Sequence, residues 1–201
     1  MAHAANPAPL GLIGFGLTTI LLNIHNAGLF GLDAMILGMG IFVGGIAQII
    51  AGVLEFRCHN TFGLTAFTSY GSFWLSLVFL VLMPQTGLVD APSDLAMACY
   101  LGLWGLFTLG MFCGTFSKPR ALQVVFGSLV VLFALLSAAK ASGSHLLHTI
   151  AGYEGILCGA SAVYFAIAQI LSDSYGRPVL PVGRPNTTSM PHIPEQQQAA
   201  A

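Results

Sequence analysis

Charged residues are scarce in this sequence, and their scarcity excludes a water-facing surface. Lys, Arg, Asp and Glu together make up 6% of the 201 residues, whereas a soluble domain carries about 25%. Hydrophobic residues make up 56%, and the mean hydropathy is +0.83. A formal net charge of -1 leaves no basic surface for nucleic acid. The composition therefore indicates a membrane protein with one compact bundle of spans and no nucleic-acid partner.

Other absences narrow the chemistry. The four cysteines lie far apart with no C-x-x-C pair, so we expect small packing residues rather than a zinc or disulfide framework. No phosphate-binding P-loop occurs, which disfavours an ATP-driven pump, and Ser69 lacks the G-x-S-x-G setting of an acyl-transfer nucleophile. The first residues lack the basic region of a cleavable signal, so we expect the first span to remain. We therefore predict no enzymatic activity, no cofactor and no metal site.

Six long apolar runs carry the fold prediction. Each has about 20 residues or more, which at 1.5 Å per residue crosses a hydrocarbon core of roughly 30 Å. Unpaired backbone groups are too costly in lipid, and the alternating segments of a β-barrel are absent, so the spans must be helices. The sequence therefore predicts an all-α membrane protein, a bundle of six transmembrane helices. The predicted spans are residues 10–30, 34–54, 62–83, 95–116, 121–139 and 146–171.

Basic residues predict the orientation of this bundle. Only Lys140 falls in a loop on one side, and the other basic residues share the opposite side: Arg57, Lys118, Arg120, Arg177 and Arg184. The positive-inside rule then places both termini in the cytoplasm. Residues 1–9 form a cytoplasmic segment, 10–172 the transmembrane domain, and 173–201 a cytoplasmic tail. We expect this tail to be disordered after about residue 183 and the glycosylation acceptor at Asn186 to be inert in it.

The first apolar run opens with the sequence NPAPLGL at residues 6–12. Two prolines exclude an ordinary helix interior, while Pro9 suits a first helical turn and Asn6 can cap the orphan amides there. Three glycines follow nearby, Gly11, Gly14 and Gly16. Because they lack side chains, another backbone or a ligand can approach closely there. This corner is either a helix start with a packing interface or part of a site, and the segment alone favours neither.

Hydroxyl groups form a stripe along the third run. Thr61, Thr65, Thr68 and Ser72 are three or four residues apart and so share one helical face. The stripe predicts a helix interface or a water-lined path, and we favour the path. Small residues recur at four-residue spacing elsewhere and predict close packing between helices or subunits. These pairs and triplets are Gly40/Gly44, Gly110/Gly114 and Ala151/Gly155/Gly159.

Ionisable residues inside the spans are few. Glu154 lies near the outer end of the sixth run. An ionisable residue in a span costs about 2.5–3.5 kcal/mol at the bilayer centre and less near the interface, so Glu154 is a functional hypothesis by default. An equal alternative is a carboxyl that pairs with a nearby histidine or faces an outer vestibule. His25 can titrate near neutral pH and gate transport, or only mark the outer mouth. His145 and His148 have no acidic or thiol partner at ligand spacing, so we expect no metal between them.

With these motifs described, the chain resembles the acetate uptake transporter family, the succinate–acetate permeases. The match includes NPAPLGL at 6–12, NTFGLTAFTSYGSFW at 60–74 and CGASA at 158–162, and it ends near 177–183. The resemblance implies a six-helix channel with a pore in each protomer, assembled as a homo-hexamer in the plasma membrane, the inner membrane of a bacterium. It implies transport of acetate and related small carboxylates, succinate among them, by a channel or by proton symport.

In proteins of that family a Phe, a Leu and a Tyr narrow the pore, which by motif match implies a constriction of Phe15, Tyr70 and Leu129. A small weak acid suits such a neck, because its methyl group tolerates apolar walls while its carboxyl needs donors on either side. Residues 6–11 are predicted to form a carboxylate station on the cytoplasmic side, where a helix N-terminus also favours an anion. The expected substrate-binding residues are Asn6, Pro7, Ala8, Gly11, Thr18, Ser69 and Tyr70. His25 and Glu154 are the candidates for proton-linked groups.

Two other functions stay open at this point. A non-transporting membrane scaffold or sensor would use the glycine faces, and Phe15 and Tyr70 would then only fill a core. A channel for a small neutral solute such as ammonia, urea or water is permitted, because no span centre carries Lys or Arg.

Overall fold

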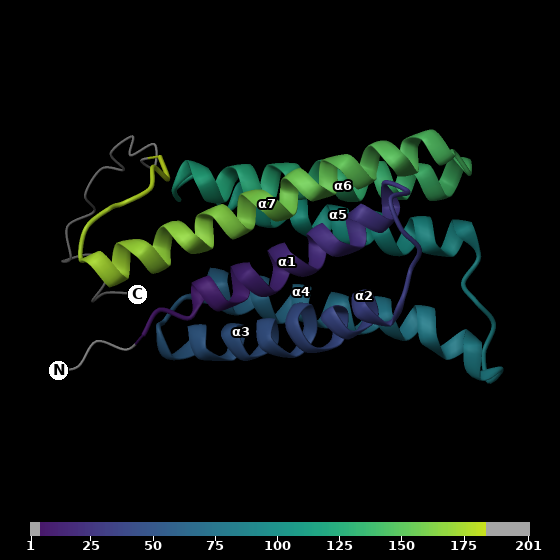
Figure 1. The fold of residues 1–201 in the computed structure, drawn as a ribbon, viewed down its shortest axis with the longest axis horizontal. Coiled ribbons are helices and arrows are strands. Elements are labelled where there is room, and N and C mark those ends of the chain that lie inside the picture. Colours follow the sequence, from purple (N-terminus) through teal and green to yellow (C-terminus); the bar gives the residue numbers. More distant parts are fainter. Residues whose placement is uncertain (1–4, 184–201) are drawn as a thin grey trace, which may run out of the picture.

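The computed structural model describes residues 5–183, and its regular structure over that range is helical, without a strand (Figure 1). Six helical spans are long and apolar enough to cross a membrane, which confirms the predicted all-α bundle of a multi-pass membrane protein. Arg184, Asn186 and the tail predicted to be disordered lie outside the described residues. The elements are α1 (Ala8–Asn26), α2 (Ala34–Met39), η1 (Gly40–Ala47), α3 (Gln48–Arg57), α4 (Thr61–Leu82), η2 (Met83–Thr86), α5 (Asp94–Cys113), α6 (Arg120–Ser142) and α7 (His145–Tyr175).

Most helices begin where the sequence supplies a capping side chain. The Asn6 Oδ1 accepts a hydrogen bond from the Ala8 amide at 3.1 Å, as expected from its place before the first turn. A side-chain oxygen caps the starts of four further helices in the same way, at Asp33, Asn60, Ser93 and Ser144. The first helix ends at Asn26, four residues before the predicted end of the run. Gly28 follows it with φ of +82°, a left-handed conformation that turns the chain away.

The second span contains a feature that its hydropathy did not predict. Between α2 and α3 the chain forms a π-helical segment, η1, instead of a continuous α-helix. The segment is rich in glycine, and its glycines lie against other helices. A Cβ on Gly44 would lie 2.9 Å from the Trp74 ring and 2.9 Å from the Thr18 methyl group. The wider winding therefore coincides with close packing of this span against α1 and α4.

The spans form two layers, with α1, α2, α3 and α4 in one and α5, α6 and α7 in the other (Figure 1). The layers meet most extensively where α1 packs along α7. Small residues allow this contact: a Cβ on Gly152 would lie 2.3 Å from the Ala27 amide nitrogen, and one on Gly159 would lie 2.7 Å from the Gly16 carbonyl oxygen. The predicted ridge that includes Gly159 is therefore a helix–helix contact within one chain.

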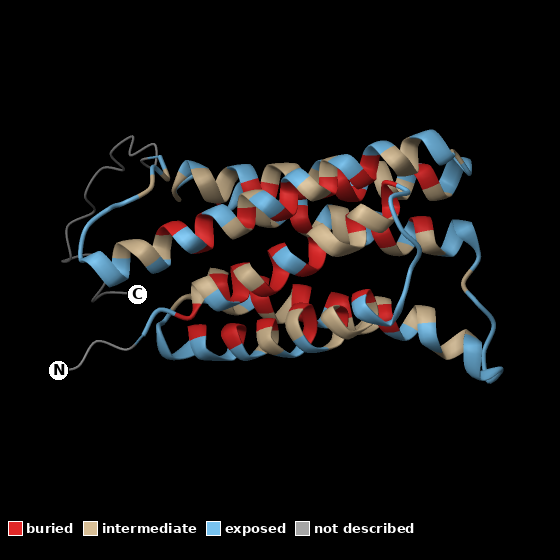
Figure 2. Ribbon diagram, viewed as in Figure 1, coloured by how far each residue is buried: buried red, intermediate tan, exposed pale blue. Residues whose placement is uncertain are grey.

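The pair Gly110 and Gly114 is packed only in part: a Cβ on Gly114 would lie 3.3 Å from the Phe62 ring, whereas one on Gly110 would meet nothing within 4 Å. Buried residues gather on the helix faces that meet between the layers (Figure 2).

Of the four cysteines only Cys158 is buried, so the expected packing role holds for that residue and not for the three exposed ones.

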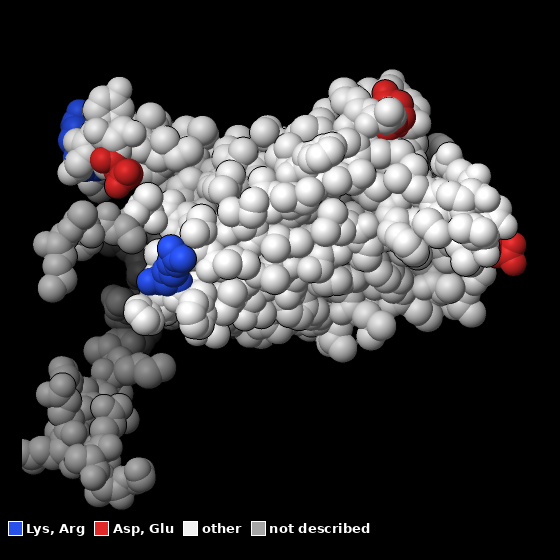
Figure 3. All heavy atoms as spheres, turned by 90° about the horizontal axis from the view of Figure 1, so that it is seen from below, with Lys and Arg blue, Asp and Glu red and all other residues white. Residues whose placement is uncertain are grey.

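On the face drawn in Figure 3, charged side chains lie near the two ends of the bundle and leave a broad uncharged belt between them. The described chain begins and ends at the same end, as six spans require. Arg57, Arg120 and Arg177 lie at that end, at the close of α3, the start of α6 and just after α7. This clustering of basic residues at the end that holds the termini is the pattern from which the positive-inside rule predicts cytoplasmic termini.

Candidate functional site

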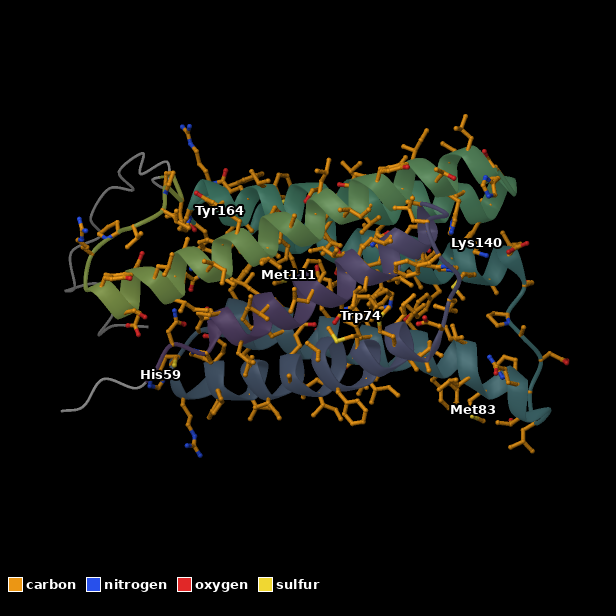
Figure 4. All side chains as sticks on the ribbon, in the orientation of Figure 1. His59, Trp74, Met83, Met111, Lys140 and Tyr164 are labelled. Carbon is orange, nitrogen blue, oxygen red and sulfur yellow. The ribbon has the colours of Figure 1, made fainter. Side chains whose placement is uncertain are left out.

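A large cavity of about 290 Å³ lies between the two layers, in the half of the bundle remote from the chain ends. Residues of α1, α2, α4, α5, α6 and α7 line it, and most of them are apolar. Trp74 lies near the middle of the bundle and Lys140 near the remote end (Figure 4). The cavity therefore extends from mid-depth toward the end opposite the termini.

A small cavity of about 70 Å³ lies in the other half, between α1, α4, α6 and α7. Its lining includes no charged residue, and its two amide side chains are Asn60 and Gln169. The two cavities share no lining residue. A solid layer of side chains therefore separates them.

The side of this layer that faces the large cavity consists of Phe15, Tyr70 and Leu129, which we call the first ring. All three are buried, all three line the large cavity, and they come from α1, α4 and α6. The ring centroids of Phe15 and Tyr70 are 6.0 Å apart. The structure thus brings together the three residues for which the sequence resemblance implies a constriction.

The side that faces the small cavity consists of Leu12, Phe67 and Phe126, which we call the second ring. Each lies three residues before the first-ring member of its own helix. The three helices run in the same direction, so the two rings are offset by about 4.5 Å along the axis. Phe126 also contacts the first ring directly, with its centroid 6.1 Å from that of Tyr70. The neck is therefore two apolar layers deep.

Hydrogen bonds hold the Tyr70 ring in the neck. Its hydroxyl donates to Thr108 Oγ1 at 2.9 Å, and Thr108 donates in turn to the Trp104 carbonyl oxygen at 2.7 Å. We expected this hydroxyl to be a donor for substrate, but the structure uses its proton to join α4 to α5. In this arrangement Tyr70 contributes its ring to the cavity wall and not a free donor.

Two polar groups in the wall of the large cavity have no hydrogen-bond partner among the described residues. They are Thr19 Oγ1 and Trp74 Nε1, and the two residues are 2% and 3% exposed. An unpaired buried polar group costs roughly 1–3 kcal/mol. Asn23, in the same wall, differs because its Nδ2 donates to the Thr19 carbonyl oxygen and its Oδ1 accepts from Asn26. Thr19 and Trp74 therefore each hold a buried polar atom in this wall that no described residue pairs.

His25 lines the end of the large cavity remote from the neck. Its Nδ1 lies 2.9 Å from the Phe30 carbonyl oxygen. A carbonyl oxygen only accepts, so Nδ1 carries a proton and donates, and Nε2 is left for a ligand. In neutral His25 Nε2 accepts a hydrogen bond, and in the imidazolium it donates one.

The small cavity has a different polar organisation, in which the amides are mostly partnered within the protein. Asn60 Oδ1 accepts from the Gly63 amide, and its Nδ2 donates to Glu55 Oε2 at 2.8 Å. Gln169 Oε1 accepts from Asn6 Nδ2 at 3.0 Å. Asn6 itself does not line the cavity, so it acts on this wall through Gln169.

The remaining residues of the predicted carboxylate station lie around the small cavity. Ala8 lines it directly, and Pro7 is buried just before it. Gly11 lies against the second ring, since a Cβ there would be 2.5 Å from the Phe67 ring. Residues 6–11 therefore shape the small cavity chiefly through their backbone and through the side-chain bulk that Gly11 lacks.

Thr18, Ser69 and Glu154 were predicted at the site, but they line neither cavity. Thr18 faces the second span and donates to the Met39 carbonyl oxygen at 3.4 Å. Ser69 is half-buried on a side of α4 away from the cavities, and Glu154 is half-buried on α7. The structure does not bring these three residues to the cavities, because each projects from another face of its helix.

The hydroxyl stripe on α4 likewise lies elsewhere. Thr61, Thr65 and Ser72 are exposed on the outside of the bundle, and Thr68 packs against Gly52 of α3. The prediction of a water-lined path along this stripe is therefore wrong, and the helix-interface alternative describes Thr68.

Several residues of the two cavity walls were not predicted as site residues from the sequence. Thr19, Trp74 and Gln169 look like ordinary span residues, and nothing in their spacing marks them. Lys140 and His148 were noted for topology and for metal spacing, but both line the large cavity. Their positions next to the loop between the last two spans place them near the same membrane face as His25, which is a signal that the sequence does contain.

The comparison with known families gives the context for this geometry. A family model described as the GPR1/FUN34/yaaH family matches residues 1–183. The chain belongs to the GPR1/FUN34/yaaH family. This assignment confirms the resemblance to acetate transporters that the motifs indicated.

Individual relatives agree with the family assignment. The chain is 61% identical over 179 residues to the succinate-acetate/proton symporter SatP of Escherichia coli (strain K12), covering 89% of this chain and 95% of the relative. It is 40% identical over 174 residues to ammonia transport outward protein 2 of Saccharomyces cerevisiae, covering 83% and 61%. A solved structure of the bacterial acetate channel SatP matches with a TM-score of 0.89 at 60% identity, covering 90% of this chain and 100% of that one.

Proposed function

We propose that this protein carries acetate and related small carboxylic acids, succinate among them, across the plasma membrane. The observation that carries the proposal is the neck of two apolar rings, with one cavity on each side and unpaired polar groups in the wall of the larger one. Relatives named for acetate and succinate transport support the choice of substrate. They also support a transporter or channel and not an enzyme.

The neck selects by the low polarity of its walls. A constriction lined by Phe15, Tyr70 and Leu129 resists wetting, so hydrated ions do not pass. An ionised carboxylate without partners is far more costly in such surroundings than a neutral acid. The geometry therefore favours passage of the protonated acid, with its methyl or methylene groups against the rings.

His25 is the residue we propose for the proton. As an imidazolium it donates from Nε2 to the carboxylate of an arriving acid, while Nδ1 stays bound to the Phe30 carbonyl oxygen. For a monocarboxylate such as acetate, transfer of that proton leaves neutral His25 and a neutral acid, which then reaches Thr19 and Trp74 and enters the neck; a dicarboxylate needs a second proton from solution. Glu154, the other candidate from the sequence, lines neither cavity and has no part in this step.

We further propose that the termini lie in the cytoplasm, so that the large cavity faces outward and the small cavity inward. The basic residues at the end that holds the described chain termini support this orientation. The family resemblance supports a homo-hexamer with one neck in each protomer. Cytoplasmic segments at residues 1–9 and 173–201 would then flank a transmembrane domain at 10–172.

Uptake into proteoliposomes tests the proposal. Purified protein is expected to accelerate entry of radiolabelled acetate over protein-free liposomes, with competition by C2 to C4 acids. Measured across a range of voltages at fixed pH, proton-linked uptake is electroneutral, whereas conduction of the bare anion gives an acetate current. Absence of accelerated uptake at every pH and voltage would overturn the proposed function.

A second candidate is a channel for a small neutral solute. The uncharged neck permits ammonia, and a yeast relative is named for ammonia transport. The same proteoliposomes separate the two candidates, because an ammonia channel alkalises the lumen on addition of ammonium salts and leaves acetate entry at the protein-free rate. A scaffold or sensor accelerates neither solute.

A further inference from the structure

The wall of the large cavity carries three basic side chains and no acidic one. They are His25 of α1, Lys140 of α6 and His148 of α7. All three belong to the end of the cavity remote from the neck. A mainly apolar cavity that carries three basic side chains and no carboxylate, in a low-dielectric setting, attracts anions and disfavours cations.

Each of these three groups keeps a nitrogen that can meet a ligand at the mouth of the cavity. His25 uses Nδ1 for the Phe30 carbonyl oxygen and keeps Nε2. His148 is half-buried, and no hydrogen bond from its ring to a described residue is present. Lys140 Nζ has one partner, Asp94 Oδ1 at 3.3 Å.

The Lys140–Asp94 pair is open to solvent, with side chains 41% and 73% exposed. Exposed pairs of this kind contribute little and exchange partners readily. Asp94 lies outside the cavity lining but offsets part of the charge of Lys140 through this pair, whereas Asp33 caps α2 and does not line the cavity. His145, the remaining charged or titratable residue at the start of α7, is exposed and does not line the cavity.

We propose that His25, Lys140 and His148 form a carboxylate-binding site at the mouth of the large cavity, and that this site selects for C4 dicarboxylates. A monocarboxylate has one anionic group for the site, whereas a dianion such as succinate has two and gains more from the three basic side chains. The site thus sets how well succinate competes with acetate. This inference rests on the proposed transport function and adds the residues that determine its substrate preference.

Substitution of Lys140 is the direct test, because its exposed side chain can be changed without opening the core. In proteoliposomes Lys140→Gln is expected to raise the KM for succinate by about tenfold and that for acetate by about threefold or less, with kcat unchanged. Loss of one charge-assisted hydrogen bond corresponds to an effect of roughly this size. Lys118→Gln, which removes the same charge at the opposite end and from neither cavity lining, is the matched control.

A second variant is expected to change the KM for succinate in the opposite direction. Asp94→Asn removes the competing carboxylate from Lys140, so the KM for succinate is expected to fall by about twofold to threefold, in line with a weak exposed pair. A role of Lys140 in folding alone would not give this gain. Equal shifts for succinate and acetate in Lys140→Gln, or no shift beyond that of Lys118→Gln, would overturn the inference.

Equilibrium binding keeps the test independent of transport. Calorimetric titration of the detergent-solubilised protein with succinate is expected to give weaker binding in Lys140→Gln than in Lys118→Gln. If neither acid is transported but this difference holds, the proposed function fails and the site stands. If both acids are transported and the difference is absent, the site fails and the proposed function stands.

Discussion

The two cavities on either side of the neck differ in how their polar groups are used. In the large cavity Thr19 and Trp74 have unpaired polar atoms, and the wall also carries three basic side chains. In the small cavity no lining residue is charged, and Asn60 and Gln169 are bonded to other parts of the protein. Groups of the first kind are available to a ligand, whereas those of the second kind mainly hold the cavity in shape.

From this difference we predict that binding and release are separated along the axis. Unpaired donors and positive charge favour capture of a carboxylic acid on the large-cavity side. The small cavity, which is uncharged and internally bonded, has little to retain an acid that has crossed the neck. Three further predictions test this difference.

The largest effect is expected from substitutions that open both rings and so join the two cavities through the neck. Leu129→Ala opens the first ring and Phe126→Ala the second, but each single change leaves the other ring closed. Each alone is expected to raise entry of a branched C4 acid such as isobutyrate by less than about threefold, and the double variant by more than about tenfold, because two barriers in series must both be removed.

Leu132→Ala provides the matched control for this experiment. Leu132 is buried one helical turn further along α6 and lines the large cavity, but it belongs to neither ring. Truncation of large buried residues costs about 2–5 kcal/mol, so thermal unfolding in detergent must accompany the flux. A double variant no leakier than its single parents would show that the neck has one barrier.

A smaller effect is expected from the unpaired hydroxyl of the large cavity. Thr19→Val removes a hydroxyl without a partner, so thermal stability is expected to stay the same or rise, while the KM for acetate rises by about fivefold, equivalent to one hydrogen bond of about 1 kcal/mol. The adjacent Thr18→Val is the control, because Thr18 donates to the Met39 carbonyl oxygen and lines neither cavity. The Thr18→Val variant is expected to lower the melting temperature slightly and to leave the KM for acetate unchanged. A raised KM in Thr18→Val with an unchanged KM in Thr19→Val would contradict the assignment of Thr19 to the substrate path.

The smallest effect is expected on the small-cavity side. Asn6→Ala removes both the cap of α1 and the hydrogen bond to Gln169, whereas Asn6→Asp keeps an acceptor for the cap and loses only the donor. We expect Asn6→Ala to lose about 1 kcal/mol of stability. Both variants should reduce acetate flux by about twofold to threefold. Unchanged affinity and flux in both variants would remove residues 6–11 from the transport path.

Much of the fold could be predicted from the sequence, because it depends on hydropathy and capping chemistry. Span length sets the number of crossings, and Asn6, Asp33 and Asn60 mark helix starts through the bonds that their side chains accept. The π-helical segment at Gly40–Ala47 could not be predicted in this way. It depends on what its glycines contact, and those contacts involve helices far away in the sequence.

The site was predicted only in part, for a related reason. Aromatic and aliphatic residues occur throughout the spans, so composition does not distinguish Phe67 and Phe126, which form the neck, from those that face lipid. Rotation about the helix axis makes that distinction, and packing between helices sets it. The same rotation turns Thr18 and Glu154 away from the cavities, although their polarity within a span favoured them as site residues.

The two rings take one member each from α1, α4 and α6, the first, third and fifth spans. A ribosome delivers spans in order, so a nascent chain with four spans in the membrane holds two members of each ring. That chain also lacks α6 and α7, which supply part of both cavity walls. The fifth span therefore completes both rings before the sixth completes the cavity walls, and biosynthesis does not pass through an open pore that awaits a closure.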